Sequence, residues 1–131
     1  MSFALLVLDT SFYSALTKND PRVQKPIRDA EERALPLVVI GELQAGFHYG
    51  SQLEKNQAEL QKVLAKANCG ILLPTMQTSL IYGRLYADLK RRGKLIPTND
   101  IWVAALTIEY EGTLATFDND FSVIPKLNLA F

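Results

Sequence analysis

Pro97-Thr98-Asn99-Asp100-Ile101-Trp102-Val103-Ala104-Ala105 is the stretch that decides how this chain folds, because a polar, acidic start leads directly into an apolar helix. From Ile101 to Tyr110, apolar residues recur at helical spacing, and further apolar side chains fill much of the opposite side. The pattern therefore predicts a helix that is buried nearly all round. We expect Thr98 or Asn99 to cap its first turn and Gly112 to end it.

Asp100 would lie in the first turn of this helix, at the positive end of the helix dipole. A carboxylate gains up to about 1 kcal/mol there, so a lone Asp100 would be explained as a helix-capping residue. That explanation loses weight only if other acids reach the same place in the fold. The positions of the other acids therefore decide between a capping role and a chemical one.

The composition is that of one domain. With 131 residues the chain can bury a single sizeable core, and we expect one domain over residues 1–131. Lys plus Arg and Asp plus Glu both number 14, so the net charge of zero argues neither for nor against a polyanionic partner. Cys69 is the only cysteine, which excludes an intrachain disulfide and suits a reducing compartment. The apolar run from Phe3 to Leu8 is too short for a signal core or a membrane span. A soluble, cytoplasmic protein with no membrane association is expected.

Short apolar runs alternate with helical patterns along the chain. Strands are predicted at 3–8, 37–40, 71–73 and 113–116, with a last edge strand at 127–131. Helices are predicted at 12–16, 22–33, 43–49, 53–67 and 76–92, besides the helix that Asp100 begins. This alternation predicts an α/β fold, a three-layer sandwich with a central, mostly parallel sheet of four to five strands.

Three further acids come just past predicted strands. Asp9 follows the first strand, Glu42 the second and Asp118 the fourth. In open parallel sheets, ligands bind at the carboxyl ends of the strands. We therefore expect Asp9, Glu42, Asp100 and Asp118 to meet at one rim.

A cluster of four carboxylates has a definite chemistry. Two ionised carboxylates about 4 Å apart repel by roughly 4 kcal/mol at an effective dielectric of 20, so the cluster must take up protons or hold a cation. Oxygen ligands without histidine or cysteine favour a hard cation, Mg²⁺ or Mn²⁺. Such an ion can activate water and stabilise the leaving oxygen of a phosphodiester. The residues predict a metal-dependent nuclease.

Competing α/β chemistries fit these residues less well. A phosphatase of the haloacid dehalogenase type needs a second Asp two residues after the first, and that position is Ser11. A response-regulator receiver needs paired acids near the first strand, where only Asp9 stands. Glycine-rich phosphate loops and the G-x-S-x-G elbow do not occur. Ser11 itself has two interpretations, a helix cap or a ligand-holding residue.

Four blocks of the sequence resemble the PIN-domain family, in particular the VapC-type toxins of bacterial toxin-antitoxin pairs. The blocks are residues 8–11, 38–43 with Gly46, 99–105 and 114–121, in the family's order and spacing over nearly the whole chain. The resemblance implies a Mg²⁺-dependent endoribonuclease that cuts cellular RNA and is inhibited by a VapB-type antitoxin. It also implies a homodimer, with the antitoxin's tail in the groove that leads to the acids.

The resemblance also implies roles for single residues. Asp9 and Asp100 would be the principal metal ligands, and Glu42 and Asp118 would complete the quartet. Thr116 would help to arrange the acids. Asp118 aligns with the family better than Asp120, for which a cap of the turn at Phe121 and Ser122 is the alternative. Supporting roles are predicted for Thr116, Ser11, Asn99 and Asp120.

A basic cluster and several tyrosines leave alternatives open. Lys90, Arg91, Arg92 and Lys94 either complement the dipole at a helix C-terminus or bind RNA phosphates beside the acidic pocket. Core packing is favoured over base stacking for the tyrosines, which are Tyr13, Tyr82 and Tyr86. Two other functions stay open: a nuclease of RNA processing without an antitoxin, and a catalytically inert module that binds RNA or protein.

Overall fold

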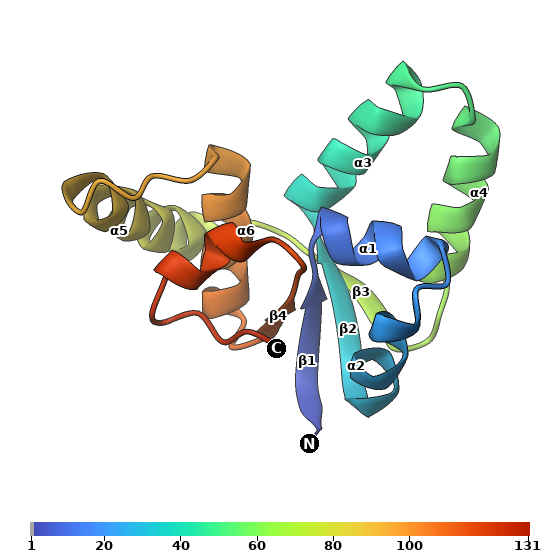
Figure 1. Cartoon of the computed structure of the whole chain (residues 1–131), viewed down its shortest axis with the longest axis horizontal. Coiled ribbons are helices and arrows are strands. Elements are labelled where there is room, and N and C mark those ends of the chain that lie inside the picture. The colour runs from blue at the N-terminus through green and yellow to red at the C-terminus, as the bar shows by residue number, and fades with distance from the viewer. Residues whose placement is uncertain (1) are drawn as a thin grey trace.

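A four-stranded sheet stands at the centre of the computed structural model, which describes residues 2–131 (Figure 1). Its strands are β1 (Phe3–Leu8), β2 (Ala30–Pro36), β3 (Cys69–Leu72) and β4 (Thr113–Ala115). They lie in the order β3-β2-β1-β4, and all three pairings are parallel. The predicted α/β sandwich with a parallel sheet is confirmed, with four strands.

The strand order explains which helices cover which face. From β1 to β3 the chain moves along the sheet in one direction, and from β3 to β4 it returns past β1. Right-handed crossovers therefore place the helices of these two parts on opposite faces, as Figure 1 shows. One face carries α1 (Thr10–Thr17), the short η1 (Pro21–Val23), α2 (Gln24–Asp29), α3 (Leu37–Tyr49) and α4 (Leu53–Leu64). The other carries α5 (Met76–Arg91) and α6 (Thr98–Glu109), and η2 (Asn119–Val123) follows β4.

Helix α6 is the buried helix that its sequence predicts. Ile101 and the run from Val103 to Thr107 are at most 1% exposed. Trp102 is half-buried and stacks on Tyr82 of α5, with ring centroids 4.2 Å apart. The predicted caps are wrong, because Pro97 precedes the helix and no side chain caps it. The apolar contacts of α6, rather than a cap, hold it in place.

Two predicted elements near Pro36 are wrong. Residues 37–40 form the first turn of α3 instead of a strand, and the predicted helix at 22–33 gives way to β2 at Ala30. Glu31 and Glu32 make the sequence of β2 polar and therefore unlike that of a central strand. Its later residues Ala34 and Leu35 are nevertheless buried, because β2 lies between β1 and β3. Position in the sheet has overridden local propensity here. Glu42 therefore lies in the second turn of a helix, not at the end of a strand.

The C-terminal segment pairs with the sheet only briefly. Instead of the predicted edge strand at 127–131, a single bridge joins Leu129 to Leu114 of β4. The backbone bonds of this bridge are Leu114 N–H to Asn128 O at 2.8 Å and Ala130 N–H to Leu114 O at 2.9 Å. The segment therefore covers the free side of β4 without adding a strand to the sheet.

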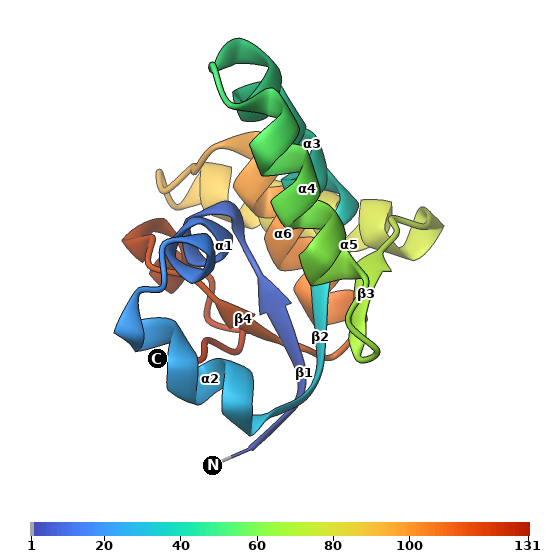
Figure 2. The same ribbon diagram turned by 90° about the vertical axis from the view of Figure 1, so that its right-hand side faces the viewer.

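Helices α3 and α4 form a hairpin that extends beyond the carboxyl ends of the strands (Figures 1 and 2). The side-chain amides of Gln44 and Gln57 join the two helices by a pair of hydrogen bonds, one of them at 2.9 Å. Within residues 2–131, no helix has the length and apolar character needed to cross a membrane.

Candidate metal centre

The site lies where the order of the strands reverses. Strands β1 and β4 are neighbours in the sheet, and the chain leaves them toward different helices. Asp9 follows β1 and Thr116 follows β4, and the backbone N–H of Asp9 bonds to the carbonyl of Ala115 at 3.3 Å. In parallel α/β sheets this is the position where a crevice for ligands forms.

A pocket of about 360 Å³ opens at this position and is lined by four acids. Asp9 comes from the end of β1, Glu42 from α3, Asp100 from the first turn of α6 and Asp118 from the loop after β4. The remaining lining residues are Thr10, Ser11, Ser14, Pro97 and Val103. The structure therefore brings the four predicted acids together, from four separate parts of the chain. We call this space the acidic pocket.

Asp9 is the most buried of these acids, at 6% exposure. Its Oδ1 accepts hydrogen bonds from the Phe12 N–H at 2.9 Å and the Ser11 hydroxyl at 2.8 Å. Its Oδ2 accepts one from the Thr116 hydroxyl. Burial raises the pKa of the Asp9 carboxyl, and these three hydrogen bonds oppose that rise. Asp9 itself is the N-cap of α1, so the capping interpretation of Ser11 is wrong.

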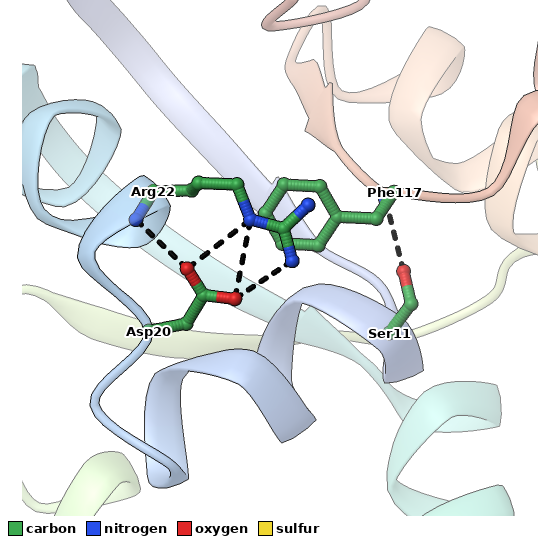
Figure 3. A network of polar contacts seen from close by, with 4 residues as sticks. All are labelled: Ser11, Asp20, Arg22 and Phe117. Atoms are coloured by element: carbon green, nitrogen blue, oxygen red, sulfur yellow. Dashed lines mark hydrogen bonds and ion pairs between the residues drawn. The ribbon is translucent and has the colours of Figure 1, made fainter.

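Ser11 and Thr116 join the two loops that carry Asp9 and Asp118. The Ser11 hydroxyl accepts from the Phe117 N–H at 3.0 Å, which Figure 3 shows. The Thr116 hydroxyl accepts from the Asp118 N–H at 2.9 Å while it donates to Asp9. Each hydroxyl thus contacts both loops and fixes the distance between the two acids.

Phe117 lies between Thr116 and Asp118 and is held on its ring faces. The Arg22 guanidinium stands 4.0 Å from the ring centroid, and the ring of Phe131 stacks at 5.3 Å. Arg22 is oriented in turn by an ion pair with Asp20 at 2.7 Å (Figure 3). Sequence reasoning did not find this support, because its members are distant from one another along the chain.

The raised pKa of Asp100 reflects its burial and the concentration of negative charge in the acidic pocket. The pKa of its carboxyl is raised from 3.8 to about 6, mainly by burial and then by the negative charges of Asp118, Glu42, Asp9 and Asp120, in that order. The ion pairs found among residues 2–131 involve Asp20, Asp29 and Asp88 and none of the acids of the pocket. The pocket therefore concentrates negative charge without a basic side chain to balance it.

Three acids at this position are close enough to share one cation. Carboxylate oxygens of Asp100, Asp118 and Asp120 all lie within 4.8 Å of one another. Asp118 also caps η2 by accepting the Asp120 N–H at 2.9 Å, so the capping role is on Asp118 rather than Asp120. Asp118 and Asp120 both reach Asp100, and only Asp118 lines the acidic pocket with Asp9 and Glu42. An all-oxygen donor set of this kind fits a hard divalent cation.

The other predicted residues lie in different places. Glu42 accepts a hydrogen bond from the Thr10 hydroxyl at 3.1 Å, a contact that the sequence pattern did not reveal. Asn99 is exposed and lines a separate hollow beside Trp102. The basic cluster is outside the lining of the acidic pocket, and its members are Lys90, Arg91, Arg92 and Lys94.

Arg92 has a structural role of its own. Its guanidinium bonds to the Asp88 carboxylate at 2.8 and 3.0 Å and to the backbone carbonyl of Val123 at 2.8 Å. It therefore ties the end of α5 to η2, the element that directly follows Asp118 in the chain.

This parallel fold, with acids gathered at the reversal of the strand order, is that of the PIN domain. The family model for the PIN domain matches residues 6–127, and the chain belongs to this family. Ribonuclease VapC2 of Rickettsia felis is 31% identical to the chain over 97 residues, which are 73% of this chain and 71% of the relative. Ribonuclease VapC1 of Haemophilus influenzae is 26% identical over 119 residues, 86% of this chain and 85% of the relative. The resemblance to VapC-type toxins is confirmed.

Solved structures share the fold over almost the entire chain. VapBC2 from Rickettsia felis, bound to a DNA fragment from its promoter, superposes with a TM-score of 0.84 at 26% identity, covering 95% of this chain and 96% of that one. DNA-bound VapBC from Salmonella typhimurium gives a TM-score of 0.83 at 18% identity, covering 96% of each chain. The second comparison shows the likeness of fold alone.

Proposed function

We propose that this chain is a Mg²⁺-dependent endoribonuclease that acts as the toxin of a toxin-antitoxin pair. The observation that carries the proposal is the meeting of Asp9, Glu42, Asp100 and Asp118 in one pocket that lacks a balancing basic side chain among residues 2–131. Relatives named as VapC ribonucleases support the choice of RNA as substrate.

The metal would be held mainly by Asp9 and Asp100, with Glu42 and Asp118 completing the set. When bound, Mg²⁺ or its substitute Mn²⁺ would lower the pKa of a water molecule and stabilise negative charge on phosphate oxygens. The chain's own contribution is orientation, since Thr116 and Ser11 hold the carboxylate of Asp9 and Thr10 holds that of Glu42. Because the pKa of Asp100 is about 6, cation binding below that pH releases a proton from its carboxyl.

The partners of the proposed enzyme are an RNA, a VapB-type antitoxin and a second copy of the chain. Support for the antitoxin comes from the solved neighbours, which include VapBC complexes from Rickettsia felis and Haemophilus influenzae. A closed dimer would present two acidic pockets on one particle. An antitoxin bound beside the acids would keep the enzyme inactive until it is removed.

Cleavage assays with purified protein test the proposal. A structured RNA and a matched DNA are incubated with Mg²⁺, with Mn²⁺ and with a chelator, beside Asp9→Asn and Asp100→Asn. Asp29→Asn serves as the control, because Asp29 pairs with Arg28 and is not part of the acidic pocket. We expect metal-dependent cutting of RNA that falls by about 100-fold or more in both pocket variants and is kept in the control.

Other outcomes separate the alternative functions. If the wild type cuts under neither metal and binds RNA as well as both variants do, the chain is an inert binding module. If it cuts RNA but co-expression with the product of the neighbouring reading frame neither inhibits it nor yields a complex, it is a nuclease of RNA processing.

A further inference from the structure

A second, smaller pocket adjoins the acidic pocket. It has a volume of about 210 Å³ and lies among α1, α3 and α4. Its lining includes Tyr13, Ser14, Lys18, Phe47, Asn56 and Glu59. Ser14 lines this space and also the acidic pocket, so the two are neighbours on either side of one α1 side chain. We call it the side pocket.

Tyr13 lines the side pocket and carries a buried polar group without a partner among residues 2–131. The residue is 3% exposed, and within residues 2–131 its buried hydroxyl has no hydrogen-bond partner. Buried hydroxyls in native proteins are normally paired, because burial removes their bonds to water. Burial and the charge of Glu59 raise the pKa of Tyr13, so the phenol stays neutral and can both donate and accept. The hydroxyl is closed off from water in this conformation, so a ligand in the side pocket reaches it only when a neighbouring lining side chain moves.

The opposite wall offers complementary polar groups. Asn56 and Glu59 are three residues apart on α4, which places them on one face of that helix. The Glu59 carboxylate only accepts hydrogen bonds, whereas the Asn56 amide both donates and accepts. Phe47 adds an aromatic ring to the wall, and Lys18 is exposed at the end of α1. This combination suits a flat, polar ligand with several donors and acceptors.

We propose that the side pocket binds one nucleobase of the RNA substrate, a guanine next to the cleaved phosphate. Guanine presents two adjacent N–H donors, which the Glu59 carboxylate would accept together. Its O6 and N7 acceptors would receive hydrogen bonds from the Asn56 amide and the Tyr13 hydroxyl. The inference rests on the proposed function, and it adds a residue set that chooses where the RNA is cut.

The position of the side pocket favours RNA over a protein side chain as its occupant. Because Ser14 lines both pockets, a strand with a phosphate at the acids would need only a short span to place an adjacent base in the side pocket. Lys18 at the end of α1 can pair with the phosphate that follows. An arginine side chain of a protein partner is the competing occupant, because its guanidinium also offers paired donors to a carboxylate.

Nucleotide binding without metal tests the side pocket independently of catalysis. The chain is titrated with GMP, AMP, CMP and UMP in the presence of a chelator and followed by NMR. We expect GMP to bind most tightly and to shift the amide signals of α1 and α4. Glu59→Gln should weaken GMP binding by about 10-fold, while Glu54→Gln, an exposed acid on the same helix, should leave it unchanged. Tyr13→Phe keeps the packed ring and should weaken GMP binding without unfolding the chain.

Cleavage of a randomised RNA then tests the consequence. We expect a guanine preference at one fixed position beside the cut, which Glu59→Gln should reduce and Glu54→Gln should keep. Equal binding of the four nucleotides, no binding of any, or binding only of an arginine-containing peptide would overturn the proposal. RNA cleavage without a guanine preference would contradict the side pocket alone. GMP binding without any RNA cleavage would contradict the proposed function and leave the side pocket standing.

Discussion

The hydroxyl of Thr116 donates a hydrogen bond to the buried carboxylate of Asp9, 107 positions earlier in the chain. The two residues stand at the carboxyl ends of β4 and β1, which are adjacent and parallel. The same hydroxyl accepts the backbone N–H of Asp118 at 2.9 Å. One small side chain therefore sets the relative positions of two acids of the pocket.

Thr116→Val should show the value of this contact, because valine keeps the shape and removes the hydroxyl. The Thr116 bond opposes the rise in the pKa of Asp9, so the pKa of Asp9 should rise further in the variant. Leaving one carboxylate oxygen and one N–H without a partner should lower the free energy of unfolding by about 1–3 kcal/mol. Urea unfolding and NMR titration of Asp9 measure the two effects. Thr116→Ser, which keeps the hydroxyl, is the control, and an unchanged Asp9 pKa in the valine variant would contradict the argument.

The acidic pocket should destabilise the metal-free fold at neutral pH. The folded pKa of Asp100 is about 6 and its ordinary value is 3.8, so between these values the folded state binds more protons than the unfolded state. The contribution of Asp100 to the free energy of unfolding must therefore fall as the pH rises from about 4 to about 6, and level off above that.

Asp100→Asn removes this penalty. After allowance for solvent screening at a partly exposed group, we expect the variant to gain about 1 kcal/mol at neutral pH, a rise in Tm of about 4 °C. Below the ordinary Asp pKa the gain should vanish, since both states are then protonated. Thermal unfolding in a chelator at the two pH values is the measurement, with exposed Glu31→Gln as the control. A variant less stable than the wild type at neutral pH would show that Asp100 is mainly a helix-dipole residue.

Two glycines should respond oppositely to alanine. A Cβ at Gly112 would lie 2.8 Å from Val7 Cγ2 and 3.3 Å from Leu5 Cδ2, so it would push against β1. We expect Gly112→Ala to cost about 1–3 kcal/mol of unfolding free energy. A Cβ at Gly83 in α5 meets nothing within 4 Å, and Gly83→Ala should stabilise by up to about 1 kcal/mol. Urea unfolding of both variants compares them, and equal effects would contradict the close approach at Gly112.

Gly112 was expected for a different reason, as the left-handed residue that ends α6. In the structure the positive φ, 56°, belongs to Glu111, and Gly112 is needed because β1 passes close to it. Helix-end patterns in a sequence thus locate the stop to within a residue. The contact between α6's end and β1 depends on tertiary packing, which no local pattern contains.

Prediction of the acidic site from the sequence is limited in the same way, because local patterns do not contain tertiary packing. Asp9 and Asp100 could be placed from the sequence because each lies beside a strongly apolar element, β1 or α6. The sequence correctly predicts that Glu42 lies near the other acids, but for a wrong reason. It predicts a strand at 37–40 that ends just before Glu42, and these residues are helical. The side pocket could not be predicted at all, because its residues come from three helices and its key group, the Tyr13 hydroxyl, sits on an apolar helix stripe.

Mutations in the basic cluster should distinguish a residue that stabilises the fold, Arg92, from residues that bind RNA, Arg91 and Lys94. Arg92 bonds to Asp88 and to the carbonyl of Val123, so Arg92→Gln should lower the free energy of unfolding by about 1 kcal/mol.

Arg91 and Lys94 are exposed and form no ion pair among residues 2–131. If they contact phosphates, Arg91→Gln and Lys94→Gln should each weaken RNA binding and reduce its salt slope by about 0.7. The readout is fluorescence anisotropy of labelled RNA with the Asp100→Asn protein at several salt concentrations. An unchanged salt slope would show that Arg91 and Lys94 do not contact RNA phosphates. Their role would then be to complement the helix dipole, because α5 ends at Arg91 and its last carbonyls attract positive charge.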